Sequence, residues 1–275
     1  MLDRALRTLR DGFVSIAYPA NCHICSRPVE SIEDGVVCSP CWNDRTITTL
    51  LDEVAICSKC GAPLSSSTRA VLRKEFDSSA GSEAASYGRG YCGSCKGAPF
   101  ALARSCGAYA GALEASVLFL KSHPHICATL RRIVCQTVFC HREALAADVV
   151  IPVPLHRLRE RRRGFNQAKI IARPVSEELG LLLDDRTLVR MRHTERHRAG
   201  MDAIDRQRSV EGAFEVVRPR RIEGASVLLV DDVYTTGSTL MSAAGALMRA
   251  GASRASALTI ARVLPGRSNW QGGNP

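Results

Sequence analysis

One segment determines the architecture of this chain of 275 residues, and it reads Val227-Leu228-Leu229-Val230-Asp231-Asp232-Val233-Tyr234-Thr235-Thr236-Gly237-Ser238-Thr239. Its first four residues are apolar, which is typical of a strand buried in a sheet. Two adjacent carboxylates are expected to end that strand. A turn of small, hydroxyl-bearing residues then leads into an Ala-rich helix. This order of strand, acidic tip, turn and helix predicts a pocket for a phosphorylated sugar.

The predicted pocket has chemistry for both ends of such a ligand. The carboxylates of Asp231 and Asp232 stand where open α/β sheets bind ligands, and they can hold ribose hydroxyls or an Mg²⁺ ion. The N–H groups and hydroxyls of the turn can surround a phosphate, whose negative charge the helix dipole favours. The alternative is an ordinary acidic turn with a Ser/Thr helix cap. The turn residues are Thr235, Thr236, Gly237, Ser238 and Thr239.

The whole segment resembles the phosphoribosyl-pyrophosphate (PRPP) signature of type I phosphoribosyltransferases. The resemblance implies that Asp231 and Asp232 contact the 2′- and 3′-hydroxyls of the ribose. It also implies that the turn over 235–239 binds the 5′-phosphate and that Mg²⁺ accompanies PRPP. The fold class that follows is α/β, with the mostly parallel sheet of those enzymes.

Eight of the 12 cysteines form four Cys-x-x-Cys pairs in the N-terminal third of the chain. Two residues between ligands let one tight turn aim both sulfurs at a single ion, and a second turn completes a tetrahedral Cys₄ site. We therefore expect one or two structural Zn²⁺ ions bound by sequential pairs, with interleaved pairing as the alternative. The pairs are Cys22/Cys25, Cys38/Cys41, Cys57/Cys60 and Cys92/Cys95.

Neither a membrane span nor a secretory signal peptide is expected from the apolar patterning. No apolar run approaches the ~20 residues that span a bilayer, and the first residues lack the apolar core of a signal peptide. A cytoplasmic protein without a membrane span is therefore expected, and disulfides are disfavoured there. The remaining cysteines, Cys106, Cys127, Cys135 and Cys140, have no paired spacing and are expected to be buried free thiols.

A second strand–loop–helix segment follows the cysteine pairs. Its strand is expected over 148–154, and its loop over 155–167 contains Arg161, Arg162 and Arg163. This loop should lie at the same sheet edge as the acidic pair, where type I enzymes place their pyrophosphate loop. Arginine presents a planar fork that matches phosphate oxygens. A solvated basic turn is the alternative.

The net charge of +10 lies in residues 101–275, because acidic and basic residues balance in the first 100. That excess suits a polyanion such as PRPP, pyrophosphate or a nucleic-acid backbone. Residues 190–214 are polar and basic, and the equivalent stretch of related enzymes is a flap that closes over PRPP. The resemblance makes Arg192, Arg206 and Arg208 candidates to reach the pyrophosphate. A surface loop without a ligand is the alternative.

Further motifs extend the resemblance from about residue 15 to 263. After the cysteine pairs come Phe119-Leu120-Lys121, Pro152-Val153-Pro154-Leu155-His156, Arg162-Arg163-Gly164-Phe165-Asn166-Gln167 and Val230-Asp231-Asp232-Val233. In this order they resemble the ComF family, which comprises zinc-ribbon phosphoribosyltransferase-like proteins linked to DNA uptake in natural transformation. The chain departs from that family at Lys121-Ser122-His123-Pro124-His125, where Lys-Tyr-x-Gly-Arg is usual, and at His197, where Gln is usual.

Three functions are compatible with these observations. The resemblance implies a phosphoribosyltransferase, in which Mg²⁺ and arginines would stabilise the departing pyrophosphate. A second function is non-catalytic handling of incoming single-stranded DNA by the arginines of 157–163, together with the DNA-uptake machinery. A third is a PRPP-responsive regulator. The first and third bind PRPP or a ribose 5-phosphate.

The expected organisation has four parts. They are an amphipathic helix over 1–18, a double zinc-ribbon module over 19–100, a phosphoribosyltransferase-like domain over 101–264 and a disordered tail over 265–275. The sheet should contain strands near 148–153, 226–231 and 255–261, with 213–217 added to it. The helix after the turn is expected over 240–250 and should end at Gly251.

Overall fold

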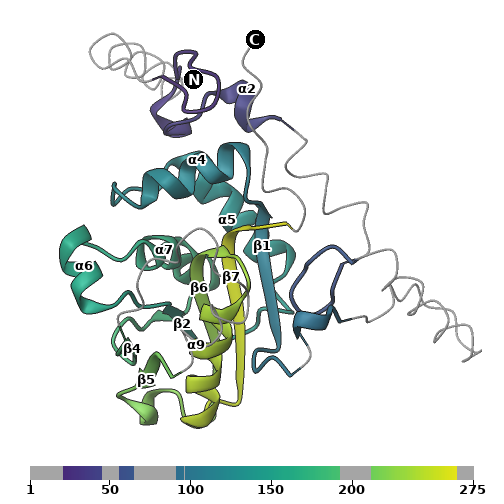
Figure 1. Cartoon of the computed structure of the whole chain (residues 1–275), viewed down its shortest axis with the longest axis vertical. Coiled ribbons are helices and arrows are strands. Elements are labelled where there is room, and N and C mark those ends of the chain that lie inside the picture. The colour runs from purple at the N-terminus through teal and green to yellow at the C-terminus, as the bar shows by residue number, and fades with distance from the viewer. Residues whose placement is uncertain (1–20, 45–55, 65–90, 96, 193–211, 265–275) are drawn as a thin grey trace, which may run out of the picture.

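The structure is a computed structural model that describes residues 21–44, 56–64, 91–95, 97–192 and 212–264 (Figure 1). The helix expected over 1–18 and the tail expected over 265–275 lie outside the described residues.

A parallel sheet forms the centre of the fold (Figure 1). Its strands are β1 (Leu102–Ala108), β2 (Val149–Pro152), β3 (Leu182–Leu183), β6 (Ser226–Tyr234) and β7 (Arg254–Arg262), in the spatial order β1-β7-β6-β2-β3. All neighbouring pairs in this sheet are parallel. The predicted α/β fold with a mostly parallel sheet is therefore confirmed. The sequence did not predict β1 and β3.

Strand β6 is longer than predicted, and the acidic pair does not end it. The strand continues to Tyr234 because its partner β7 is equally long. The pairs along this extension are Asp231 with Thr259, Val233 with Ala261, and Tyr234 with Arg262. The two carboxylates therefore stand on backbone that the sheet holds in place, not on a free turn.

The segment near 213–217 does not join the main sheet as predicted. Instead, β5 (Phe214–Val216) pairs antiparallel with β4 (Leu188–Arg190) in a separate two-stranded sheet. Phe214 and Leu188 are buried in one apolar cluster with the helix that follows β6. Burial of this aromatic side chain explains why the segment packs there.

Helices cover both faces of the main sheet (Figure 1). One face is covered by α4 (Gly111–Leu120), α5 (Ala128–Cys140) and α7 (Gln167–Leu179), and the other by α9 (Ser238–Arg249). Helix α9 begins two residues before the predicted start, because Gly237 is its N-cap, and Gly251 follows its end with φ 97°. The shorter helices are η1 (Ile32–Asp34), α2 (Ser39–Trp42), η2 (Gly93–Cys95), α6 (Arg157–Arg163) and η3 (Pro219–Arg221).

The apolar residues of β6 alternate between two cores. Val227 and Leu229 pack with α9, whereas Leu228 and Val230 pack with the helices on the other face. All four side chains are almost completely buried. Each such burial contributes about 1.5–3 kcal/mol, so this strand is anchored from both sides.

The first Cys-rich segment packs on α4 and α5. Val37, which is fully buried, lies in one cluster with Ala112 and Ala115 of α4. The carboxylate of Asp34 accepts hydrogen bonds from Ser39 Oγ at 2.7 Å and from Thr129 Oγ1 of α5 at 2.8 Å. One acidic side chain thus fastens this segment to the helical layer.

The second Cys-rich segment belongs to the core on the α9 face of the sheet. Cys57, Cys60 and Leu64 are buried in the same cluster as Phe100 and Ala103. The backbone continues this contact, since the Ala103 N–H donates to the carbonyl of Lys59 at 2.7 Å. The α/β part therefore has no complete core on this face without the second segment.

The four cysteines outside the pairs have different environments. Cys127 is buried, as predicted. Cys106 and Cys135 are half-buried, and Cys140 is exposed. The prediction of a buried thiol is therefore wrong for Cys140, which is the last residue of α5.

Among the described helices, none combines the length and the apolar character that crossing a bilayer requires.

Candidate functional site

The carboxyl ends of β2 and β6 meet at one edge of the sheet, because the two strands are parallel neighbours. The side chains of Asp231 and Asp232 are both half-buried there. The Asp232 N–H donates to Asp231 Oδ1 at 2.9 Å, and the Val233 N–H donates to Asp232 Oδ1 at 2.7 Å. These bonds fix both carboxylates at the edge of the sheet.

Gln167 connects the segment after β2 to the acidic pair. Its Nε2 donates to Asp232 Oδ2 at 3.2 Å, while its Oε1 accepts a hydrogen bond from Arg163 Nη1. Gln167 is buried, so these partners replace the water that its amide would otherwise bind. The chain of contacts brings one guanidinium to the acidic edge.

The electrostatics of the pair are asymmetric. Burial, and then the charge of Asp232, raise the pKa of Asp231 well above its ordinary value. The Asp232 N–H and the guanidinium of Arg190 act in the opposite direction but do not cancel the shift. A buried carboxylate beside another carboxylate is a site that gains from binding a cation or a hydroxyl donor.

The turn after β6 contains a left-handed glycine that starts the next helix. Gly237 is left-handed, with φ 80°, and it is the N-cap of α9. Thr236 Oγ1 and Ser238 Oγ lie 2.7 Å apart and share a hydrogen bond. Thr235 is exposed and Thr239 is half-buried. Because α9 starts at this turn, its first N–H groups and its positive dipole end lie beside these hydroxyls.

The arginine-rich segment after β2 is a helix, not the predicted loop. It forms α6, whose N-cap His156 accepts from the Leu158 N–H at 3.3 Å and whose C-cap Gly164 is left-handed. Three arginines in its last turn suit the negative end of the helix dipole. Arg161 and Arg162 are exposed, and only Arg163 among the three makes the contact with Gln167 described above.

The candidate flap arginines are described only in part. Arg192 is exposed two residues after β4 ends. Arg206 and Arg208 lie outside the described residues, as does His197.

Two residues that the sequence did not single out interact electrostatically with the acidic pair. Arg190, at the end of β4, interacts electrostatically with Asp231 and is partly desolvated above the Phe214 ring, 5.2 Å from its centroid. Tyr109 lies just beyond β1. Its burial raises the pKa of its hydroxyl, and the negative charges of Glu114 and Asp232 raise it further. Both residues come from strands remote in sequence, so no local pattern could have indicated them.

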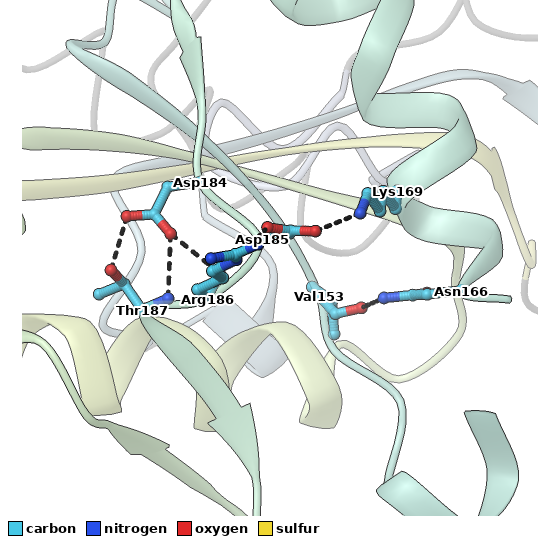
Figure 2. A network of polar contacts seen from close by, with 7 residues as sticks. All are labelled: Val153, Asn166, Lys169, Asp184, Asp185, Arg186 and Thr187. Atoms are coloured by element: carbon cyan, nitrogen blue, oxygen red, sulfur yellow. Dashed lines mark hydrogen bonds and ion pairs between the residues drawn. The ribbon is translucent and has the colours of Figure 1, made fainter. Parts of the chain in front are cut away.

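Polar contacts join the start of α7 to the segments that follow β2 and β3 (Figure 2). Asn166 caps α7, accepting from the Ala168 N–H at 3.1 Å, and its Nδ2 donates to the carbonyl of Val153 at 3.0 Å. Lys169 of the same helix forms an ion pair with Asp185 (Figure 2). The start of α7, which carries Gln167, is thereby fixed to the end of β2.

The Asp184 side chain organises the turn between β3 and β4 (Figure 2). Its carboxylate accepts from the N–H groups of Arg186 and Thr187 and from Thr187 Oγ1 at 2.6 Å. Burial raises the pKa of Asp184, but the hydrogen bonds from Thr187 and Arg186 outweigh it and lower the pKa overall. This turn sets the direction of β4 and thus the position of Arg190.

The eight paired cysteines form two separate clusters, with the sequential pairing that the sequence predicts. Within each cluster the four sulfurs lie within 4.8 Å of one another. Sulfurs from different pairs approach to 3.5 Å between Cys25 and Cys38, and to 3.6 Å between Cys60 and Cys92. A tetrahedral zinc site with bonds of about 2.3 Å needs sulfurs roughly 3.8 Å apart. Both clusters therefore fit a structural zinc ion.

Arginines next to the sulfurs favour the thiolate form that zinc requires. In the first cluster, Arg27 Nε donates to Cys25 Sγ at 3.4 Å, and this bond lowers the pKa of Cys25 to about 6. In the second cluster, Arg262 Nη1 lies 3.6 Å from Cys60 Sγ. Both places thus combine four cysteine sulfurs with a neighbouring cationic side chain.

Comparisons with known proteins agree with this description. A family model described as a double zinc ribbon domain matches residues 13–75. The DNA utilization protein YhgH of Salmonella typhimurium is 29% identical over 256 residues, which cover 90% of this chain and all of that protein. The Competence protein F of Haemophilus influenzae is 35% identical over 117 residues, covering 42% of this chain and 51% of that protein. Competence protein ComFC of Bacillus subtilis is 34% identical over 119 residues, covering 42% of this chain and 44% of that protein.

Two solved structures also resemble part of the chain. The glutamine PRPP amidotransferase of B. subtilis matches 52% of this chain and 30% of its own, with 22% identity and a TM-score of 0.35. The purine phosphoribosyltransferase of Pyrococcus horikoshii matches 48% of this chain and 70% of its own, with 19% identity and a TM-score of 0.30.

The fold and the thiol clusters define a double-ribbon protein built onto a parallel α/β sheet. The similar proteins carry the names DNA utilization protein and competence protein. The chain is similar to these proteins, in agreement with its resemblance to the ComF family.

Proposed function

We propose that this protein binds PRPP together with Mg²⁺ at the carboxyl edge of β6. The observation that carries the proposal is the placement of the half-buried acidic pair and the hydroxyl-lined turn on one continuous strand–turn–helix unit. In this assignment Asp231 and Asp232 hold the ribose hydroxyls and the metal ion. The turn Thr235–Thr239 holds the 5′-phosphate, and Arg163 lies on the pyrophosphate side.

The reaction class that suits this site is phosphoribosyl transfer. The C1–O bond to pyrophosphate breaks, a bond from C1 to the acceptor forms, and the acceptor's proton passes to solvent. Arg163, Arg190 and Arg192 supply the positive charge that a departing pyrophosphate needs. Arg206 and Arg208 have the same role in the proposal. We also propose the division into a cysteine-rich part over 19–100, which carries both zinc ions, and a PRPP-binding part over 101–264.

Calorimetric titration with PRPP and Mg²⁺ tests the proposal. Asp232→Asn should weaken binding by at least ~100-fold, because hydrogen bonds to a charged group contribute about 1.5–3 kcal/mol each and two are lost. Asp148→Asn is the matched control, since Asp148 caps the opposite end of β6 by accepting from the Ser226 N–H at 2.7 Å. Equal affinities in both variants, or no heat with the zinc-loaded wild type, would contradict the assignment.

Asp231→Asn should abolish binding while stabilising the free protein. The raised pKa of Asp231 means that the folded state disfavours its charged form. As pH rises through the folded pKa, the folded protein gives up a proton that the unfolded chain has already lost, so stability falls. Asn removes that penalty at neutral pH. Each kcal/mol gained raises the melting temperature by about 2–4 °C in a chain of this size. A melting temperature below that of the wild type would show that the carboxylate stabilises the fold.

A second candidate function is binding of single-stranded DNA, and one observation favours it. Exposed arginines gather in α6 and around a surface hollow that η3 lines. Those of α6 are Arg157, Arg161 and Arg162, and those of the hollow are Arg218, Arg220 and Arg221.

Oligonucleotide binding across a salt series tests this second function. Replacing Arg157, Arg161 and Arg162 by Gln should lower the slope of log K against log salt by about two, at roughly 0.7 per phosphate contact. A charge-matched control replaces Arg131, Arg132 and Arg142, which are exposed in and just after α5. The same slope in both triple variants would exclude α6 as the DNA-binding surface.

A further inference from the structure

Two buried or partly buried arginines stand beside the second thiol cluster. Arg262 is 5% exposed, and its Nη1 donates to the carbonyl of Cys60 at 2.9 Å and lies 3.6 Å from Cys60 Sγ. Arg104 Nη2 donates to the carbonyl of Ser58 at 3.1 Å. Within the described residues, neither arginine forms a salt bridge with a carboxylate. A buried guanidinium needs a compensating negative charge, and a zinc ion with four thiolates carries two.

The guanidinium of Arg262 also stacks on Tyr234, the last residue of β6, which carries the acidic pair. Its guanidinium carbon lies 4.0 Å from the centroid of the Tyr234 ring, and the two residues are register partners at the ends of β7 and β6. Tyr234 is 4% exposed, and its ring meets Phe100 edge-on at 6.5 Å between centroids. A cation–π contact this well shielded from water is among the stronger ones.

Tyr234 restricts the turn over 235–239, which we call the phosphate turn after its proposed ligand. Its hydroxyl oxygen occupies the space of a side chain at Gly237, since a Cβ built there would lie 2.3 Å from that oxygen. Gly237 is the left-handed N-cap from which α9 starts. One unbroken set of contacts therefore runs from Cys60 through Arg262 and Tyr234 to the turn at Gly237.

The first thiol cluster has different neighbours. It packs on α4 through Ala112 and Ala115. Its arginine, Arg27, is exposed and contacts Cys25. The first cluster therefore serves as a comparison. It also has an arginine beside a cysteine sulfur, but it packs against α4 and not against the turn at Gly237.

We propose that the second cysteine cluster, when it holds its metal ion, positions the phosphate turn through Arg262 and Tyr234. Arg262 is a positioning residue. Its positive charge compensates the thiolates of the metal site, and the face of its guanidinium stacks on the Tyr234 ring. The turn is correctly formed only while the second site is intact, and the first site has no such effect. The consequence for ligand affinity rests on the proposed PRPP site, whereas the mechanical coupling does not.

Hydrogen–deuterium exchange of the backbone N–H groups of 235–241 tests the coupling without any ligand. Arg262→Met keeps the bulk of the side chain and removes the charge, and it should accelerate exchange in this segment about tenfold or more. Arg27→Met is the matched control and should leave exchange at 235–241 unchanged. Zinc content is measured on both variants. Unchanged exchange in Arg262→Met would overturn the proposal, as would equal acceleration in Arg27→Met.

A second variant covers the case in which Arg262→Met does not fold. Tyr234→Leu leaves Arg262 and the cysteines in place, so the protein should retain its zinc and yet exchange faster at 235–241. Protection equal to that of the wild type would overturn the proposal. PRPP titration is run in parallel, with about tenfold weaker binding expected in both variants. If the wild type binds no PRPP, the proposed function fails, while the exchange data still decide whether the coupling exists.

Discussion

Gly237→Ala is expected to abolish binding at the phosphate turn and to destabilise the fold by about 2–4 kcal/mol. The backbone here has φ 80°, where a Cβ already costs about 1 kcal/mol or more. The larger part of the cost is steric. The new Cβ would lie 2.3 Å from the hydroxyl oxygen of Tyr234 and 2.6 Å from its Cζ. Tyr234 is buried and contacts both Arg262 and Phe100, so moving its ring away would break these contacts.

Gly180→Ala separates the two parts of that cost. Gly180 caps α7 with φ 66°, and a Cβ built there meets no atom within 4 Å. Its replacement should therefore cost only the backbone contribution, about 1 kcal/mol. Denaturant unfolding of both variants measures the difference, and PRPP titration shows whether binding is lost only in Gly237→Ala. Equal destabilisation of the two variants would mean that Tyr234 does not constrain the turn.

The sequence predicted the elements whose pattern is local. A buried apolar strand, an acidic pair and a small-residue turn are adjacent in the chain, so β6 and the start of α9 could be located to within a few residues. The cysteine pairs are local as well, and their spacing sufficed for the correct grouping. Strand β1 carried no such signal. Its centre holds Arg104 and Ser105, because Arg104 contacts the second Cys-rich segment in place of an apolar core.

The residues of α6 do carry helix signals, namely helix-forming arginines between two capping residues. The strand–loop–helix pattern predicted a phosphate-binding loop over 155–167, yet five of the seven residues in 157–163 are arginine, which is a good helix former. His156 and Gly164 also stand where an N-cap and a left-handed C-cap belong. The positions of Arg190 and Tyr109, in contrast, have no local sequence signal. Tyr109 follows β1 of the main sheet and Arg190 ends β4 of the two-stranded sheet, so their places depend on long-range strand pairing that one sequence does not display.

Cys57→Ser is expected to have the largest effect of any single substitution in the chain, because it removes a zinc ligand from inside the main core. Cys57 is fully buried, and its Sγ accepts from the N–H groups of Cys92 at 3.3 Å and Cys60 at 3.5 Å. Structural zinc contributes about 10–16 kcal/mol of apparent binding free energy in small ribbons, which exceeds the net stability of most domains. The variant should therefore lose cooperative unfolding of the α/β part.

Cys25→Ser is the matched substitution and should have a local effect. Cys25 is half-buried at the periphery of the first cluster, whose contacts reach α4 and α5 but not the α9 face of the sheet. The variant should bind one zinc ion where the wild type binds two, and it should keep the main thermal transition. Zinc analysis and calorimetric melting measure both quantities. If Cys25→Ser unfolds the sheet as completely as Cys57→Ser does, the two ribbons form one cooperative unit, and the separate role assigned to the second ribbon is wrong.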